Sequence, residues 1–381
     1  MLTTIGQGAD LRARSRVIRV HALSMSVLDP CPCSIQEVRL SGQVVRAAAV
    51  QLEGVPGRVD LTLGRLETMV VEAAERGARL IAVPEFCTSP LPMRAEVHDA
   101  VLPRENVAVD MFRRLAARYR LTVGGAMVVA DDDEVYNRYH LVEPDGFVHT
   151  HDKDLPTMWE NCFYTGGGYY RDGSDDGAFE TALGGVGVAS CWELIRTGTV
   201  RRLRGRVGVA VTGTHWWTVP RNWGGLTDRV LGPLAQYNRY LSENAPAEFA
   251  RRLGAPVLQA SHCGSFRTDF LLAPGTGVCV PYETEYVGAT QIVDASGTVL
   301  ASRRADEGPG VVYADVTLGA REPVLPLEDR FWIPELPLLL RGYWHQQNVA
   351  GRSYYRRRGR SAGLRAAGSH RAAGADGPAR G

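Results

Sequence analysis

The feature that most constrains the fold of this chain is a succession of short apolar runs separated by helix-like segments. The run 45–52 reads as a buried strand, apolar residues then recur with helical spacing over 60–77, and a second apolar run covers 79–85. Asp60 is predicted to cap this helix and Gly77 to end it. The order strand, helix, strand predicts a sheet with helices packed against it.

The same alternation continues along the chain, and two hairpins interrupt it. The hairpin turns are predicted at Glu143–Gly146 and Asp294–Gly297, where Pro, Asp and Gly suit tight turns. The other predicted elements are helices over 107–119, 192–206 and 232–252 and strands at 121–130, 184–191, 207–214, 256–261 and 311–318. Because hairpins accompany the alternating pairs, the pattern fits mixed α/β sheets with helices outside better than a purely parallel sheet.

The two ends of the chain differ from this folded part, which is predicted to span residues 43–320. Residues 1–42 show no clear periodicity and are predicted to be a poorly ordered extension. Residues 321–350 are richer in large apolar residues and are predicted to be a packing or dimerisation segment. Residues 351–381 carry eight Arg and one Asp, a charge of +7 in a chain whose total is +1. So few large apolar side chains cannot offset the entropy of ordering, which predicts a basic, disordered tail.

Composition limits the compartment and the partners. The seven cysteines are odd in number and form no ladder of spacings, which favours a reducing, cytoplasmic location over a disulfide framework. Cys31 and Cys33 lack a second Cys/His pair nearby, so no metal site is expected there. No apolar run approaches the ~20 residues that cross a membrane. A short Arg-rich terminus is usually solvated, so no nucleic-acid partner is expected either.

Three reactive residues end or border predicted strands. Glu85 ends the run 79–85, Lys153 follows a hairpin strand, and Cys191 ends the run 184–191. Strand ends collect reactive side chains in sheets flanked by helices. Glu85 is the predicted general base for the Cys191 thiol, and Lys153 the predicted oxyanion stabiliser. The backbone N–H of Trp192 supports the same oxyanion if a helix begins there, and a helix N-terminus also favours thiolate.

The motifs around these residues resemble those of the nitrilase superfamily of carbon–nitrogen hydrolases. They are AVQL near the start, VPEF with Glu85, HDKDLPTMWE with Lys153, and GVASCWE with Cys191, and they cover about 44–318. The resemblance implies a four-layer αββα sandwich and dimers or higher homo-oligomers. It also implies that Glu160, shortly after the lysine, orients Lys153 and helps to position substrate or water.

The same resemblance leaves the branch of the superfamily open. The sequence Trp192-Glu193 after the cysteine is similar to the motif of true nitrilases, but Leu194 stands where those enzymes carry Asn. We expect hydrolysis of a small-molecule, non-peptide amide or carbamoyl bond through a cysteine thioester, with release of ammonia or an amine. A nitrilase, an acyltransferase that passes the acyl group to an amine, and a non-catalytic binding homologue are the alternatives. No metal or other cofactor is expected.

The substrate pocket is predicted from the loop THWWTVP after the strand 207–214. His215 and Trp216, with Trp192, are the candidate substrate-binding residues, and they suggest a bulky, mostly apolar wall. The alternative is that these tryptophans belong to the core or to a dimer interface. Glu193 is expected to be a first-turn acid that complements a helix dipole.

Overall fold

The structure is a computed structural model that describes residues 42–92, 94–168, 175–271 and 278–375. Apart from residue 42, the predicted extension 1–42, with its pair Cys31 and Cys33, lies outside the described residues. Among the helices that are described, none combines the length and the apolarity needed to cross a bilayer.

Six strands form the first sheet, in the order β6-β5-β4-β2-β1-β15. Their bounds are β1 (Val44–Leu52), β2 (Leu80–Ala82), β4 (Thr122–Asp131), β5 (Glu134–Val142), β6 (Val148–Asp152) and β15 (Gly310–Thr317). Strands β1, β2 and β4 are parallel, whereas β5, β6 and β15 join by antiparallel pairing. The short β3 (Leu102–Pro103) pairs with the end of β4. The predicted hairpin at Glu143–Gly146 therefore connects the edge strand β6 to its neighbour β5.

Six further strands form the second sheet, in the order β7-β8-β9-β10-β13-β14. Their bounds are β7 (Ala178–Thr181), β8 (Gly184–Ser190), β9 (Val209–Thr214), β10 (Val257–His262), β13 (Gly288–Val293) and β14 (Val299–Arg304). The two sheets join where the carboxyl ends of β1 and β10 pair, through Gln51 with Ser261 and Leu52 with His262. Each sheet thus has its own strand order, and the short pairing of β1 with β10 connects the two sheets.

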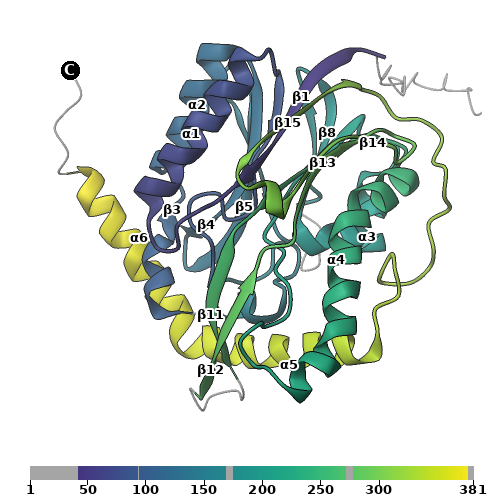
Figure 1. Cartoon of the computed structure of the whole chain (residues 1–381). Helices are drawn as coiled ribbons and strands as arrows, with labels where there is room; N and C mark the ends of the chain where they lie inside the picture. Colours follow the sequence, from purple (N-terminus) through teal and green to yellow (C-terminus); the bar gives the residue numbers. More distant parts are fainter. Residues whose placement is uncertain (1–41, 93, 169–174, 272–277, 376–381) are drawn as a thin grey trace, which may run out of the picture. The chain divides into compact units, whose positions relative to one another are not determined.

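Helices cover the outer face of each sheet, and apolar side chains fill the space between the sheets (Figure 1). The helices are α1 (Val59–Glu75) and α2 (Val107–Tyr119) on the first sheet, and α3 (Thr197–Leu203) and α4 (Leu226–Leu253) on the second. Ala47 and Leu141 of the first sheet share the inner core with Val188 and Val211 of the second. The layers are therefore helix, sheet, sheet, helix, and the predicted four-layer αββα sandwich is confirmed.

The helix starts differ in how they are capped. Helix α1 begins at Val59 after Arg58, and Asp60 lies in its first turn, where it bonds the Arg58 guanidinium at 2.9 Å. The prediction that Asp60 caps the helix is therefore wrong, because a neighbouring cation takes up its carboxylate. Helix α2 has a side-chain cap, since Asn106 accepts hydrogen bonds from the backbone of Ala108 and Val109.

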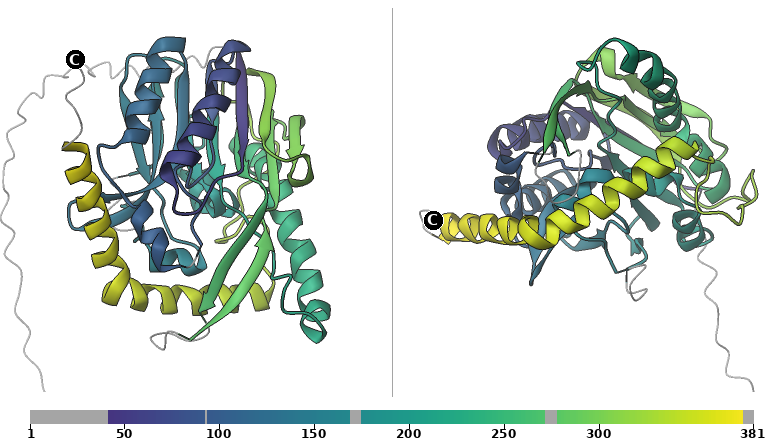
Figure 2. Two further views of the ribbon diagram at one scale, coloured as in Figure 1. Left: turned by 60° about the vertical axis from the view of Figure 1, so that its left-hand side comes forward. Right: turned by 90° about the horizontal axis from the view of Figure 1, so that it is seen from below.

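The C-terminal segment is helical, and the prediction of a disordered tail is wrong over 351–375. The helices are α5 (Leu338–Tyr354), a π-helical turn η5 (Tyr355–Gly359) and α6 (Arg360–Ala375), which form one continuous helical rod that bends between α5 and α6 (Figure 2). Small residues face the body: a Cβ on Gly359 would lie 2.0 Å from the Cys162 carbonyl oxygen, and Ala367 is buried. The Tyr355 hydroxyl also bonds Glu134 at 2.7 Å. Close packing therefore compensates for the lack of large apolar side chains.

The apolar part of 321–350 folds back on its own chain. Leu340 and Trp344 are buried against the α4 side of the second sheet, whereas Leu338 and Leu339 are exposed. The remaining elements are η1 (Ala95–Ala100), η2 (Met158–Cys162), η3 (Cys191–Ile195), η4 (Ala305–Glu307) and the hairpin β11 (Ser265–Leu271) and β12 (Cys279–Glu285). This last hairpin was not among the predicted elements.

Candidate active site

The three reactive residues predicted from the sequence follow the ends of three strands. Glu85 lies three residues after β2, Lys153 directly follows β6, and Cys191 directly follows β8 and begins η3. The side chains of Glu85 and Lys153 have no exposed surface, and Cys191 is 1% exposed. Two sheets therefore contribute to one buried group of side chains, because β6 belongs to the first sheet and β8 to the second.

The lysine holds two carboxylates together. Lys153 Nζ donates to Glu85 Oε1 and to Glu160 Oε2, at 2.8 Å each. Glu160 is fixed by its own helix, because it is the third residue of a capping box in η2 and accepts from the Thr157 backbone N–H at 2.7 Å. The structure thus brings together three of the four residues predicted to be catalytic, with Glu160 in the place expected for a group that orients Lys153.

The charges of this group are set by burial and by pairing. Burial and the nearby Glu160 charge raise the pKa of Glu85 to about 7, although Lys153 acts to lower it. Burial acts to lower the pKa of Lys153, but the carboxylates of Glu160 and Glu85 outweigh it and raise that pKa above its ordinary value. At neutral pH the lysine is therefore an ammonium, and Glu85 is poised to take up or give a proton.

The thiol of Cys191 lies within the field of these charges. Burial, followed by the charge of Glu85, raises its pKa well above the ordinary value; Lys153 and a backbone hydrogen bond from His215 act in the opposite direction. The thiol is therefore protonated at neutral pH and needs a base to become a nucleophile.

Backbone strain accompanies the site. Cys191 has a φ of +53°, in the left-handed region that few residues other than glycine adopt. Phe86, next to Glu85, and Met158, at the start of the Glu160 helix, each have a φ of +54°. At each of these three residues the chain makes a sharp turn, out of a strand or into a 3₁₀ helix. Such left-handed residues are typical of functional sites.

Two buried residues outside the predicted catalytic set donate further hydrogen bonds to the two carboxylates. Asn137, on β5, donates to Glu85 Oε1 at 2.8 Å, and the Tyr164 hydroxyl donates to Glu160 Oε2. The sequence predicted a catalytic role for neither residue. The signal for Asn137 was present, since an amide stands among the apolar and aromatic residues of strand 134–142 and occupies a buried position there.

A small cavity of about 60 Å³ lies beside the thiol. Cys191 and Glu160 line it, together with Trp192, Trp216 and Trp217. Two of the predicted substrate-binding residues, Trp192 and Trp216, thus lie in its wall, although both also pack in the core. His215 does not line this cavity.

The His215 side chain is held elsewhere in the core. Its Nε2 accepts from the Leu91 backbone N–H at 3.2 Å and lies 2.9 Å from the Tyr286 hydroxyl. Aromatic rings, including those of Phe86 and Phe266, surround the imidazole. His215 is therefore held by core contacts and is not among the residues that line this cavity, and its contact with substrate stays a prediction.

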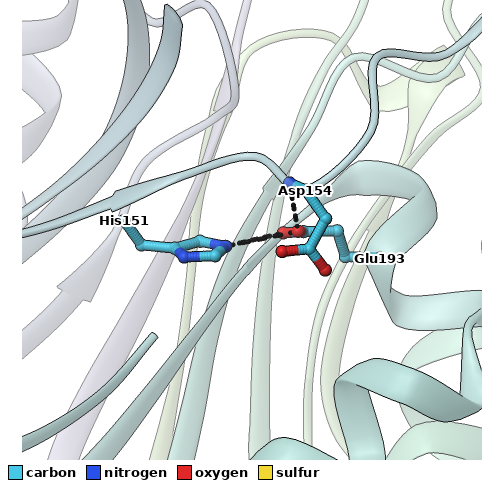
Figure 3. A group of neighbouring side chains, drawn as sticks. All are labelled: His151, Asp154 and Glu193. Carbon is cyan, nitrogen blue, oxygen red and sulfur yellow. Dashed lines mark hydrogen bonds and ion pairs between the residues drawn. The ribbon is translucent and has the colours of Figure 1, made fainter. Parts of the chain in front are cut away.

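His151, Asp154 and Glu193 form a second buried charge cluster (Figure 3). His151, Asp154 and Glu193 present atoms within 4.8 Å of one another, a set that is able to bind a metal ion. The cluster has cations of its own, because Arg202 lies 3.5 Å from Glu193 and 3.8 Å from Asp154. Burial acts to lower the pKa of His151, but the charge of Glu193 helps to raise it to about 10, so the imidazole is itself a cation. These charges fit an ion network and not a metal site.

This network joins the lysine segment to the cysteine segment. The Glu193 carboxylate accepts from the backbone N–H of Asp154 at 2.9 Å and from that of Ser190 at 2.6 Å. Asp154 follows Lys153 and Ser190 precedes Cys191 in the chain. As predicted, Glu193 lies in the first turn of a helix, where it closes a capping box with Ser190. It also fixes the spacing of the two reactive residues.

Comparison with known proteins identifies the family. The family model "Carbon-nitrogen hydrolase" matches residues 46–324, more than half of the chain. The chain belongs to the carbon–nitrogen hydrolase family. Among curated relatives, this carbon–nitrogen hydrolase is 25% identical over 303 residues to the bifunctional nitrilase/nitrile hydratase NIT4A of Lupinus angustifolius, covering 72% of this chain and 78% of the relative. It is 30% identical over 168 residues to nitrilase 3 of Arabidopsis thaliana, covering 39% and 47%.

Solved structures support the fold of this carbon–nitrogen hydrolase. Nit3 of Saccharomyces cerevisiae, a member of branch 10 of the nitrilase superfamily, has a TM-score of 0.54 and 20% identity, covering 75% of this chain and 93% of its own. An amidase from Nesterenkonia sp. has a TM-score of 0.52 and 18% identity, covering 76% and 95%. At these identities the likeness concerns the fold, and it agrees with the layers described above.

Proposed function

We propose that this carbon–nitrogen hydrolase cleaves a non-peptide amide bond through a thioester on Cys191. The proposal rests on the hydrogen bonds from Lys153 to both Glu85 and Glu160. The charges of all three groups act on the pKa of the Cys191 thiol. A base with a pKa of about 7, a fixed ammonium and a buried thiol are the groups that acyl transfer requires.

In the first step Glu85 accepts the thiol proton and the sulfur attacks the amide carbon. The carbonyl oxygen becomes an oxyanion, and the Lys153 ammonium stabilises its charge. The carbon–nitrogen bond then breaks, and Glu85 returns the proton to the leaving nitrogen, which departs as ammonia or an amine. In the second step Glu85 takes a proton from water, the hydroxide attacks the thioester, and the thiol is restored as the carboxylic acid leaves. Glu160 holds Lys153 throughout.

A nitrile is the second candidate substrate. Two observations favour it: the sequence Cys191-Trp192-Glu193, and the curated relatives, which are named nitrilases or bifunctional nitrilase/nitrile hydratases. Addition of the thiol to a nitrile gives a thioimidate on the same sulfur, and water then releases either an amide or, after loss of ammonia, an acid. An amide and a nitrile that carry the same acyl group can therefore be assayed side by side, and their products show which of the two the enzyme converts.

The proposal is tested by replacing the nucleophile. We expect Cys191→Ala to lower ammonia release from an amide or nitrile by at least about 10⁴-fold, because no other group of the site is able to form the thioester. Cys279→Ala is the matched control, since Cys279 is exposed and lies on β12. Turnover by Cys191→Ala at the wild-type level would contradict the proposal, and a chelator is expected to leave the wild-type rate unchanged.

The same assay distinguishes acyl transfer and the binding homologue. Added hydroxylamine competes with water for the thioester, so a product that is mostly hydroxamate at low hydroxylamine indicates an acyltransferase. A Cys191 thiol that forms no adduct with a substrate-sized electrophile, while Cys279 does, indicates a non-catalytic homologue. The hydrolase predicts an adduct on Cys191 in the intact protein and mostly free acid as product.

A further inference from the structure

The cavity beside Cys191 is partly closed by a segment that lies outside the family domain. The family match ends at residue 324, whereas Leu340 and Tyr343 of α5 line the cavity. The helix is fixed close to the site, because Asn348 accepts a hydrogen bond from Asn161 of η2 at 2.9 Å. Gly351 also allows close approach, since a Cβ there would lie 2.6 Å from the Cβ of Asn161. The wall formed by α5 therefore has a defined position relative to the Glu160 helix.

The lining of the cavity carries no free charge. Among the described residues that line it, Glu160 is the one carboxylate, and Lys153 neutralises it; none is an arginine, lysine or histidine. Burial raises the pKa of the lining phenols of Tyr282 and Tyr343, so both are neutral at physiological pH. Three of the polar lining residues, Asn238, Trp216 and Tyr282, form hydrogen bonds within the protein.

Two hydrogen bonds show this internal pairing. The Asn238 amide accepts from Trp216 Nε1 at 2.6 Å and donates to the Trp217 carbonyl oxygen. The Tyr282 hydroxyl donates to the Thr218 carbonyl oxygen at 2.6 Å. These polar groups already have hydrogen-bond partners within the protein, so they need none from the substrate.

We propose that the cavity selects substrates whose acyl group is uncharged and apolar, and excludes acyl groups that carry a second carboxylate. The inference rests on the proposed function. A carboxylate in this cavity has no counter-ion, and a buried, unpaired charge is costly. Leu340 and Tyr343 supply the outer part of this apolar wall.

The test compares two amides of similar size with the full-length protein. Butyramide has an apolar end, and succinamate has a carboxylate at the corresponding end; butyronitrile and 3-cyanopropanoate form the equivalent nitrile pair. We expect kcat/KM for ammonia release to favour the uncharged member of a pair by at least about 100-fold. Equal rates within a pair would overturn the inference and leave the proposed function standing. Failure to cleave any neutral or charged substrate would instead contradict the proposed function.

A charged side chain introduced into the cavity wall provides a second test of the inference. Leu340→Arg introduces a counter-ion, and we expect it to raise the succinamate to butyramide ratio of kcat/KM at least about 10-fold. Leu339→Arg is the matched control, because Leu339 is the preceding residue of α5, is 62% exposed and does not line the cavity. If Leu340→Arg does not fold, Val219→Arg replaces it, since Val219 lines the same cavity and is only half-buried. A folded wall variant with an unchanged ratio, or an equal rise in Leu339→Arg, would overturn the inference.

Discussion

At the scale of single residues, Glu85 has an asymmetric environment. Its Oε1 accepts hydrogen bonds from Lys153 and Asn137, whereas its Oε2 is buried and has no hydrogen-bond partner in the described part of the chain. A buried carboxylate oxygen without a partner is costly unless a substrate or a proton occupies it. The pKa of about 7 follows from this burial, and it places the protonation change of Glu85 within the physiological range.

This pKa predicts the pH dependence of activity. Below about pH 7 Glu85 is protonated and is unable to accept the thiol proton, so kcat/KM is expected to fall about tenfold per pH unit. Asn137→Leu removes a hydrogen bond that favours the carboxylate, and we expect it to move this acid limb upward by up to about one unit. The measurement is ammonia release from an uncharged amide between pH 5 and 9. An acid limb near 4.5, or one unmoved by Asn137→Leu, would contradict this role of Glu85.

At the scale of elements, the long C-terminal rod α5-η5-α6 packs on η2, the short helix that carries Glu160. A Cβ on Gly359 would meet the Cys162 backbone at 2.0 Å, and one on Gly351 would meet Asn161. Backbone cannot move aside as a flexible side chain does, so these glycines set how closely the rod approaches the site. The position of η2 therefore depends on residues far from Glu160 in the sequence.

A pair of glycine variants tests this dependence. Gly359→Ala forces η5 away from η2, and we expect roughly 1–3 kcal/mol of lost stability and a kcat/KM lowered about tenfold. Gly368→Ala is the control on the same rod, where a Cβ meets nothing within 4 Å, and it is expected to be neutral or stabilising because alanine favours helix. Thermal unfolding and ammonia release measure the two effects. Equal behaviour of the two variants would show that the rod does not position η2.

The elements also show what sequence patterns reveal and what they leave out. Helix α2, the hairpin turn Glu143–Gly146 and the reactive strand ends follow from periodicity and turn residues, which are local properties of the chain. The order of α6 does not, because its Gly, Ala and Arg residues resemble a disordered tail until Gly359 is seen against Cys162. Likewise, Glu85, Lys153 and Cys191 were predictable from their motifs, but the orientation of His215 depends on distant contacts with Leu91 and Tyr286.

At the scale of the whole molecule, the buried ion network connects the two sheets. His151 comes from β6 in the first sheet, and Glu193 follows β8 in the second; they lie 3.2 Å apart. His151 also bonds Asp175 at 2.6 Å. Breaking such a buried pair is strongly destabilising, because it leaves an uncompensated charge. The protonation of one histidine therefore contributes to the cohesion of the two sheets, beside the apolar inner core and the β1–β10 pairing.

The raised pKa of His151 predicts a loss of stability in alkaline solution. Its proton is bound in both the folded and the unfolded protein below about pH 6.5, but only in the folded protein between 6.5 and about 10, so stability decreases over that range. We expect the free energy of unfolding to fall by roughly 4 kcal/mol from pH 7 to 10, measured by urea denaturation. His151→Gln, less stable at pH 7, should show a smaller decrease. An equal slope in both proteins would contradict the prediction, since other titrating groups are common to both.

The expectation of a homodimer concerns the same scale and stays a prediction. Leu340 and Trp344, considered for a subunit interface, are buried within the chain itself. Leu338 and Leu339, which begin α5, remain exposed. We propose that any interface formed by this segment uses these exposed first residues of α5.

One consequence follows from the location of the cavity's outer wall. Glu85, Lys153 and Cys191 belong to the part of the chain that matches the family, whereas Leu340 and Tyr343 come after it. The reactive residues and one part of the substrate wall are thus encoded in consecutive stretches of the gene. Evolution or a protein engineer can vary the range of accepted compounds at Leu340 and Tyr343, as long as the glycine contacts that position η2 are kept.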